Sequence, residues 1–348
     1  MHRGGPQMQG IAEMPAPKEA KLAWTFNAGK PVKGSIAIAQ KRVFFGDDLG
    51  IVHAVGLADG KEQWTYKTEG SIEATPLILD GVVYIGSSDA NLYALDAATG
   101  KFKWKYETGD KILGGANHAP SPTGKGECIL VGSYDFSLHC IDPATGKAIW
   151  KASTDNFING SPAVLPTGEV IFGGCDSLVH VVKIQDGKEV RQIETDAYIA
   201  SSIAVKDGIG YVGNYGNIVV ALDLQKGETK WKYHDRDFPY FSSAAVTADR
   251  VIIGGRDKRL HCLDRATGNS VWDFQTRGHV DSSPVVCGDA VIAGSLDGRL
   301  YCVGLADGKE RWTYEIGAPV TSSPAAADGV IVVGAEDGNV FAFGTAAK

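Results

Sequence analysis

The sequence predicts an all-β protein, an eight-bladed β-propeller of four-stranded antiparallel blades. A segment of about 40 residues recurs eight times, and a second marker, Gly-Lys-x-x-Trp, keeps step with it. Asp-Gly and similar turns between short apolar runs fit four strands in each repeat. The first glycines of the eight copies are Gly46, Gly86, Gly132, Gly173, Gly213, Gly254, Gly294 and Gly334.

The composition is typical of a folded protein and excludes several classes. Of the 348 residues, 44% are hydrophobic and 22% are charged, which excludes a disordered or fibrous chain. The 34 basic and 41 acidic residues give a net charge of −7, which argues against a nucleic-acid partner. No apolar run approaches the ~20 residues that a membrane-spanning helix needs, so no transmembrane segment is expected.

The second repeat shows how each blade divides into strands. Short apolar or aromatic runs are separated by turn residues such as Asp80-Gly81, which indicates a chain of hairpins. The four strands are expected at residues 75–78, 82–86, 92–96 and 104–106.

The two ends of the chain predict how the ring closes. The last repeat stops after its third strand, while Trp24 stands in an outer-strand segment that precedes the first blade. Residues 22–27 are therefore expected to supply the outer strand of the eighth blade, which removes two open sheet edges. Residues 21–348 are expected to form one propeller domain, and residues 1–20 a flexible tail that lacks the apolar core of a signal peptide.

The run from Ala94 to Trp104, Ala-x-Asp-x-x-Thr-Gly-Lys-x-x-Trp, resembles the tryptophan-docking motif of the pyrroloquinoline quinone (PQQ) repeat propellers. The resemblance covers residues 22–348 and implies that each tryptophan packs on the next blade. Arg191 departs from the pattern, so this contact is not predicted after the fourth blade. The docking residues are Trp24, Trp64, Trp104, Trp150, Trp231, Trp272 and Trp312.

This family contains quinoprotein alcohol dehydrogenases and non-enzymatic propellers of the BamB type. The short loops and the absence of adjacent cysteines favour a non-catalytic, monomeric scaffold that binds a protein partner and needs no cofactor. One alternative is a dehydrogenase with PQQ and Ca²⁺ in the axial funnel and Asp281 or Glu73 as base; another is a small-ligand sensor. The resemblance implies the bacterial periplasm or cell envelope, but no export signal is recognisable, so a cytoplasmic location stays open.

The cysteines and most histidines are expected to be structural. Cys140, Cys262 and Cys302 occupy equivalent positions in different blades, too far apart for a disulfide. Four histidines share one third-strand register, which predicts packing rather than a common metal site. Aspartates near the turns before these strands are expected to form turn hydrogen bonds. The four histidines are His53, His139, His180 and His261.

The connections between blades are the best candidates for a partner surface, because loops on a rigid scaffold often carry function. The connection 234–241 is charged and aromatic. Residues 108–119 are interpreted as carrying four of the six extra residues of the third blade, and the turn 123–127 the other two. Aromatic and arginine residues dominate binding hot spots. The expected partner-binding residues are Arg236, Phe238, Tyr240, Phe241, Asn117 and His118.

One register immediately before each inner strand is expected to surround the mouth of the central channel. It reads Lys33, Glu73, Asn117, Asn159, Ala200, Phe241, Asp281 and Thr321. Carboxylates, amides and a nearby histidine suit a cation or a polar ligand. A solvated polar rim is the competing interpretation. The channel-mouth candidates are Glu73, Asn159, His279 and Asp281.

Overall fold

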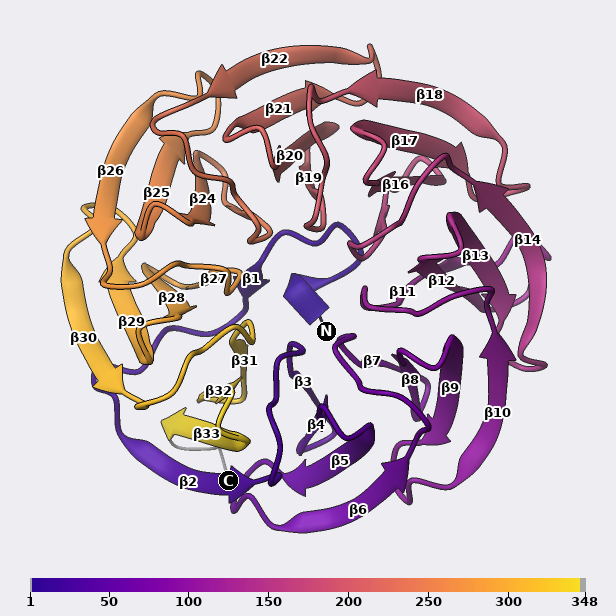
Figure 1. Cartoon of the computed structure of the whole chain (residues 1–348), viewed down its shortest axis with the longest axis horizontal. Coiled ribbons are helices and arrows are strands. Elements are labelled where there is room, and N and C mark those ends of the chain that lie inside the picture. Colours follow the sequence, from indigo (N-terminus) through magenta and orange to yellow (C-terminus); the bar gives the residue numbers. More distant parts are fainter. Residues whose placement is uncertain (1, 345–348) are drawn as a thin grey trace.

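The computed structural model describes residues 2–344, and Met1 and residues 345–348 lie outside the described part. Eight antiparallel four-stranded sheets surround a central axis, one of them extended by a short fifth strand (Figure 1). This confirms the predicted eight-bladed propeller. The described residues contain one helical element, the 3-10 turn η1 (His2–Gly4), and none of their helices is long and apolar enough to cross a membrane.

Each blade runs from an inner strand at the axis to an outer strand at the periphery. The inner strands are β3 (Ala37–Ala39), β7 (Leu77–Leu79), β11 (Asn117–Pro120), β15 (Ala163–Val164), β19 (Ala204–Lys206), β23 (Ala245–Val246), β27 (Val285–Cys287) and β31 (Ala325–Ala327). The second strands are β4 (Arg42–Gly46), β8 (Val82–Gly86), β12 (Glu127–Ser133), β16 (Glu169–Gly173), β20 (Ile209–Gly213), β24 (Arg250–Gly255), β28 (Ala290–Ser295) and β32 (Val330–Gly334).

The third and outer strands complete the blades. The third strands are β5 (Ile51–Gly56), β9 (Asn91–Asp96), β13 (Ser137–Asp142), β17 (Leu178–Lys183), β21 (Val219–Asp223), β25 (Arg259–Asp264), β29 (Arg299–Gly304) and β33 (Asn339–Gly344). The outer strands are β2 (Leu22–Asn27), β6 (Glu62–Lys67), β10 (Phe102–Glu107), β14 (Lys147–Ser153), β18 (Glu189–Glu194), β22 (Glu228–Tyr233), β26 (Ser270–Gln275) and β30 (Glu310–Glu315).

Burial along the strands follows from the stacking of blades. The third strand β9 is buried at five consecutive positions, because neighbouring blades cover both of its faces. The outer strand β6 buries Trp64 and exposes the residues on either side of it. Residues on two-sided strands can therefore be apolar throughout, whereas the outer strands alternate with a period of two.

The ring closes as the sequence predicts. Strand β2 pairs antiparallel with β33, with Trp24 opposite Ala342 and Phe26 opposite Val340. Residues from near the start of the chain thereby become the outer strand of the eighth blade (Figure 1). Closure pairs two strands that would each leave a row of unpaired backbone groups in an open sheet.

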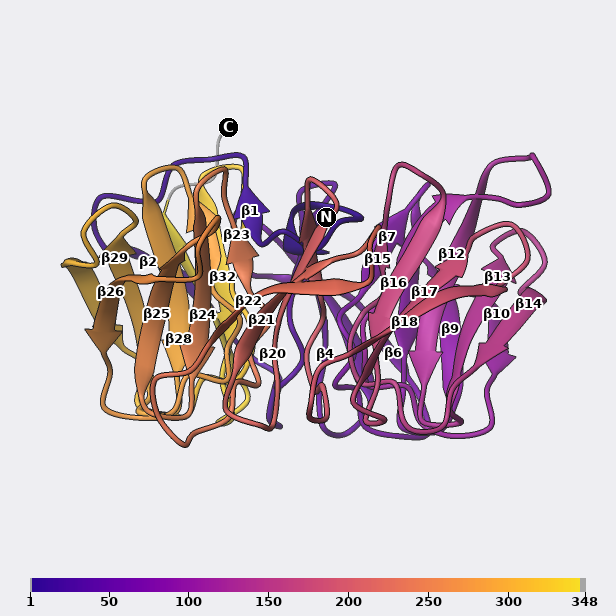
Figure 2. The same ribbon diagram turned by 90° about the horizontal axis from the view of Figure 1, so that it is seen from above.

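The N-terminal segment, residues 2–20, differs from the expected flexible tail. It crosses one end of the central channel, as the edge-on view shows (Figure 2). Strand β1 (Ile11–Ala12) pairs parallel with β27, and Met8 is buried. Four carbonyls of the segment accept backbone N–H groups from four successive inner strands: Pro6 from Val164, Gln7 from Val205, Gln9 from Val246 and Gly10 from Val286.

The N-terminal segment is held in the channel because the inner strands are sheet edges whose N–H groups face the axis. An unpaired backbone donor in a confined channel is costly, and an extended peptide of almost any sequence can satisfy it. The sequence-based expectation of a flexible tail rested on three prolines and low apolar content, and neither property indicates whether the backbone of the segment is hydrogen-bonded.

The long repeat of the third blade also differs from the sequence interpretation. Its extra residues form the turn 121–126 between β11 and β12, whereas β7 and β8 are joined by a two-residue turn. The connection into the third blade is of ordinary length, because Ile112 packs against Gly86 as Ile72 packs against Gly46. Residues 108–119 thus contain no insertion, and the extra residues lie at the opposite end of the blade, where the sequence reading had placed only two of the six.

Candidate functional site

Interblade hydrogen bonds connect every blade to the next. Each docking tryptophan donates its indole N–H to a backbone carbonyl oxygen of the following blade or segment. Gly100 permits this approach beneath Trp64, because it has a φ of +70° and a Cβ there would lie 2.6 Å from the indole ring. The pairs are Trp24 to Leu57 at 2.8 Å, Trp64 to Ala97 at 3.1 Å, Trp104 to Pro143 at 2.9 Å, Trp150 to Ile184 at 2.7 Å, Trp231 to Arg265 at 3.0 Å, Trp272 to Leu305 at 2.9 Å and Trp312 to Pro17 at 2.8 Å.

Two features of the interblade hydrogen bonds were not predicted from the sequence. Arg191 takes the tryptophan position of the fourth blade, and its Nη1 donates to the carbonyl oxygen of Leu224 at 2.6 Å. The eighth docking carbonyl belongs to Pro17 of the N-terminal segment. The ring is therefore fastened at all eight junctions, one of them through an arginine.

The third-strand histidines form buried pairs with turn aspartates. The Nε2 atoms of His139 and His180 lie 3.1 Å and 2.9 Å from the carboxylates of Asp135 and Asp176. In the second blade a tyrosine replaces histidine and donates to Asp89. These repeated pairs confirm the structural role predicted for the histidines and aspartates.

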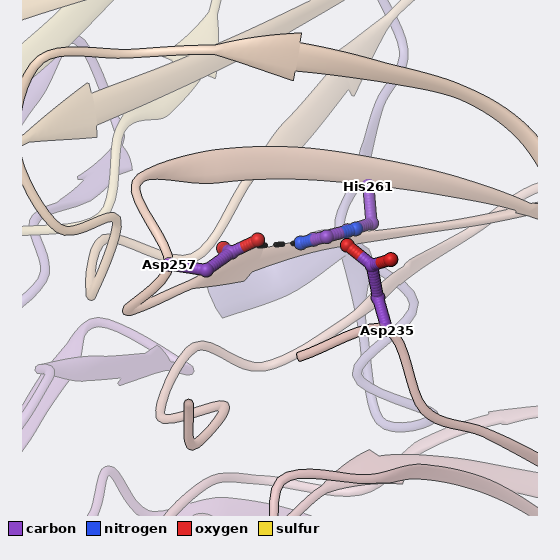
Figure 3. A group of neighbouring side chains, drawn as sticks. All are labelled: Asp235, Asp257 and His261. Carbon is purple, nitrogen blue, oxygen red and sulfur yellow. Dashed lines mark hydrogen bonds and ion pairs between the residues drawn. The ribbon is translucent and has the colours of Figure 1, made fainter. Parts of the chain in front are cut away.

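The His261–Asp257 pair has a second acidic residue, Asp235, beside it, and two carboxylates with an imidazole are ligand types of metal sites. Ligand atoms of Asp235, Asp257 and His261 lie within 4.8 Å of one another (Figure 3). Nε2 of His261 is hydrogen-bonded to Asp257 at 3.2 Å, and Nδ1 to the hydroxyl of Tyr233 at 3.2 Å. Asp235 also faces the guanidinium of Arg259 at 3.8 Å. Both ring nitrogens are already engaged, so the cluster has the geometry of the other histidine–aspartate pairs and not of a metal centre.

Aromatic side chains gather on one face of the ring. This face, here called the connection face, carries the connections between blades and the turns between second and third strands. The two kinds of loop are hydrogen-bonded to each other; for example, the backbone N–H of Tyr215 donates to the carbonyl oxygen of Tyr198. Tyr134 stacks on Phe157 at 4.4 Å, and Tyr215 packs on Phe241 at 4.5 Å. We call the set the aromatic arc; it consists of two packed groups, one of Tyr134, Phe136 and Phe157 and one of Tyr198, Tyr215 and Phe241, together with the exposed Phe238.

An arginine joins the arc to Asp281, which was expected at the channel mouth but is not among the residues that line the funnel. The guanidinium of Arg256 lies 4.0 Å above the ring of Phe241 and forms a two-pronged ion pair with Asp281, with N···O distances of 3.0 Å and 2.7 Å. This hydrogen bonding raises the pKa of Arg256 above its ordinary value. Asp281 is thus engaged with a permanent cation, which disfavours its expected role as a base or a cation ligand.

The structure separates the residues that the sequence grouped as a partner surface. Arg236 and Phe238 are exposed on the connection face, and Phe241 is half-buried there. Tyr240 is 2% exposed and packs against Gly213, so it is not a surface anchor.

The remaining two predicted partner-binding residues lie elsewhere. Asn117 is buried and donates from Nδ2 to the carbonyl oxygens of Pro6 and Pro162, so it holds the N-terminal segment. His118 pairs with Glu127 at 3.1 Å beside the turn 121–126 that joins β11 to β12, away from the arc. Neither residue reaches the connection face, because the register there begins four residues earlier than the sequence reading had it.

The arc members that sequence reasoning missed share a recognisable signal. Tyr134 and Tyr215 stand two residues after the repeat glycines Gly132 and Gly213, in the turn before the third strand. Tyr198 lies in a connection between blades, at the position that Phe157 holds in the preceding connection, and is 53% exposed. Aromatics at these turn positions could have been collected from the repeat alignment.

The channel mouth opens into a narrow axial funnel of about 150 Å³. Lys33, Glu73, Leu113 and Asn159 line its rim, and Arg3 of the N-terminal segment lines its inner end. Leu113 holds the position that the sequence reading had assigned to Asn117. Asn159 donates to the sulfur of Cys175 at 2.9 Å, and His279 stands outside the funnel lining.

The fold and these sites define a PQQ-repeat propeller with a crowded axis and an aromatic connection face. Matches to the family model described as outer membrane protein assembly factor BamB cover residues 13–156, 134–273 and 256–347. The chain belongs to this family.

Comparison with solved structures supports the fold. The computationally designed Ika8 protein superposes with a TM-score of 0.81 at 15% identity, covering 93% of this chain and 99% of the other. BamB from Moraxella catarrhalis superposes with a TM-score of 0.77 at 20% identity, with the same two coverages. At such identities the likeness concerns the fold alone.

Similar enzymes match only a small part of their length. The 1-butanol dehydrogenase (cytochrome c) of Thauera butanivorans is 33% identical over 95 residues, which are 24% of this chain and 14% of the enzyme. The quinohemoprotein alcohol dehydrogenase of Comamonas testosteroni is 31% identical over 94 residues, which are 24% of this chain and 13% of the enzyme.

The funnel does not fit the cofactor of a quinoprotein dehydrogenase. Its volume of about 150 Å³ lies below the ~300 Å³ at which pockets for organic ligands begin. The N-terminal segment occupies its inner end, and Asp281 is paired with Arg256.

Proposed function

We propose that this protein is a non-catalytic scaffold of the bacterial cell envelope that binds a protein partner through the aromatic arc. Family membership supports the envelope location and the class of partner, since the family model is described as an outer membrane assembly factor. The exposed aromatic cluster on a rigid ring is the observation that carries the proposal.

The arc has the composition expected of a binding hot spot. Tyr198 is 53% and Tyr215 is 47% exposed, although large apolar rings are usually covered. Each is held by an aromatic neighbour, so little conformational freedom is lost on binding. Arg256 adds a cation that is already oriented by Asp281. Aromatic and arginine side chains contribute most of the energy in typical interfaces.

Site-specific photo-crosslinking tests the proposal. A photoreactive phenylalanine at position 215 should form a discrete adduct with an envelope protein, and the same group at position 102 should not. Phe102 is a matched control, because it is 49% exposed but lies on the outer strand β10. Tyr198→Ser with Tyr215→Ser should abolish capture of that protein, while Phe102→Ser leaves capture unchanged. Equal adducts at both positions would contradict the proposal.

Titration calorimetry with PQQ, with and without Ca²⁺, tests the dehydrogenase reading separately. We expect no saturable heat, because the funnel is too small for the cofactor. Binding near one molecule per chain would reopen that reading.

A further inference from the structure

Arg3 is a buried cation without a counter-ion in the described structure. It is 7% exposed, and its Nη2 donates to the backbone carbonyl oxygens of Ser243 and Ala244. Its Nε and Nη1 have no hydrogen-bond partner, and no carboxylate of residues 2–344 forms an ion pair with it. Burial lowers the pKa of Arg3 to about 9, so the guanidinium is still charged at neutral pH.

A ring of hydroxyl groups lines the same funnel. Four serines each accept a backbone N–H from the preceding blade: Ser202 from Ser161 at 2.9 Å, Ser243 from Ser202 at 3.0 Å, Ser283 from Ser243 at 2.9 Å and Ser323 from Ser283 at 3.0 Å. We call these four side chains the hydroxyl ring.

The geometry of the hydroxyl ring leaves protons to donate. Each oxygen is engaged as an acceptor, and within residues 2–344 none of the four hydroxyls has an acceptor of its own. The ring and Arg3 line one funnel, so free hydroxyl donors and a buried cation without a counter-ion line the same cavity. At the rim, Lys33 is paired with Asp48 at 2.7 Å, and the exposed Glu73 is the one carboxylate of the funnel lining.

Free donors around an uncompensated charge suit one kind of ligand. An unpaired buried ion costs several kcal/mol, and a charge-assisted hydrogen bond to an oxyanion removes much of that cost. The funnel volume of about 150 Å³ admits a group of a few atoms but not a large organic molecule.

We propose that the axial funnel binds a small oxyanion, a carboxylate or a phosphate, through the Arg3 guanidinium and the hydroxyl ring. The ligand site is centred on Arg3 and the hydroxyl ring rather than on the aromatic arc, although Phe241 of the arc also lines the funnel. A bound oxyanion would supply the negative charge that Arg3 lacks, since its hydrogen-bond partners in the described structure are neutral backbone carbonyls.

The test follows the Nε–H resonance of Arg3 by ¹⁵N NMR on the full chain. Sodium acetate and sodium phosphate are titrated separately against sodium chloride at constant ionic strength. A saturable shift with one of them is expected, and the salt that gives it identifies the oxyanion. Calorimetry provides a second readout of the same binding.

Two variants and one control make the test decisive. Arg3→Gln and Ser283→Ala should weaken binding by about tenfold or more, the loss of a charge-assisted or a neutral hydrogen bond. Lys309→Gln removes a fully solvated charge and should bind as the parent does. A linear response to both salts, or equal affinity in Arg3→Gln, would overturn the proposal. If Arg3→Gln does not fold, the resonance shift and Ser283→Ala still decide.

Discussion

Nη1 of Arg191 donates a 2.6 Å hydrogen bond to the carbonyl oxygen of Leu224, which is the contact made by an indole N–H at every other junction of the ring. The arginine side chain lies against Gly227, where a Cβ would be 2.7 Å from its Cδ. The repeat thus requires a long side chain with an N–H donor at this position, and a planar guanidinium meets that requirement as an indole does.

Arg191→Ala should destabilise the protein by about 1–3 kcal/mol, because it leaves the Leu224 carbonyl unpaired. Urea unfolding followed by tryptophan fluorescence measures the effect. Arg191→Trp should restore the bond and most of the stability. An unchanged free energy of unfolding in Arg191→Ala would show that this hydrogen bond does not contribute to stability.

Trp104→Ala should cost more, about 3–5 kcal/mol, because a large apolar side chain and its hydrogen bond to Pro143 are both lost. The same unfolding experiment provides the comparison. Phe102→Ala, on the same strand but exposed, should change the free energy of unfolding by less than about 0.5 kcal/mol.

The N-terminal segment should detach when Gly10 is replaced by valine. Gly10 has a φ of +69°, and a Cβ there would lie 2.9 Å from the Cβ of Ala245. We expect the amide protons of Val205 and Val246, which are bonded to the segment, to exchange faster with deuterium. Gly81→Val is the control, since Gly81 also has positive φ but no atom near the added carbon. Unchanged exchange rates in Gly10→Val would mean that these amides are protected by other means.

The charge of His180 should make stability depend on pH. Burial alone would lower its pKa, but hydrogen bonds to Asp176 at 2.9 Å and Glu189 at 2.6 Å raise it above the ordinary value. A pKa raised in the folded state stabilises the protein below the unfolded value of about 6.5, and this contribution disappears as pH rises through the folded value.

Glu189→Gln should therefore lose more stability at pH 5.5 than at pH 8.5. Free energies of unfolding of both proteins at the two pH values measure the difference. A penalty that is the same at both would show that the imidazole of His180 does not carry the charge.

Arg256→Gln separates stability from recognition. Its ion pair with Asp281 is partly solvated, so the free energy of unfolding should fall by less than about 1 kcal/mol. Capture of the partner at the aromatic arc should nevertheless weaken, because the cation over Phe241 is lost. Crosslinking yield at position 215 in this variant is the measurement; full yield would remove Arg256 from the interface.

The candidate site was only partly predictable. The exposure of Arg236 and Phe238 follows from a charged and aromatic loop, which is a local property of the sequence, and their role in partner binding stays a prediction. Tyr240 was misassigned because it occupies the register of Ile72 and Ile112, where the residue packs under the repeat glycine of the previous blade. Asn117 was misassigned because the extra residues of the third blade were placed on the wrong side of its inner strand.

The sequence by itself determined the number of blades, the strand order within each blade and the closure by residues 22–27. These features repeat, and each copy carries the same apolar and turn residues, so side-chain chemistry encodes them. Only the tertiary structure decided the course of residues 2–20, the docking of Trp312 on Pro17 and the position of Arg3 on the axis. In each of these contacts the acceptor is a backbone carbonyl far away in the chain, and every residue carries such a carbonyl, so the order of side chains does not indicate which one is used.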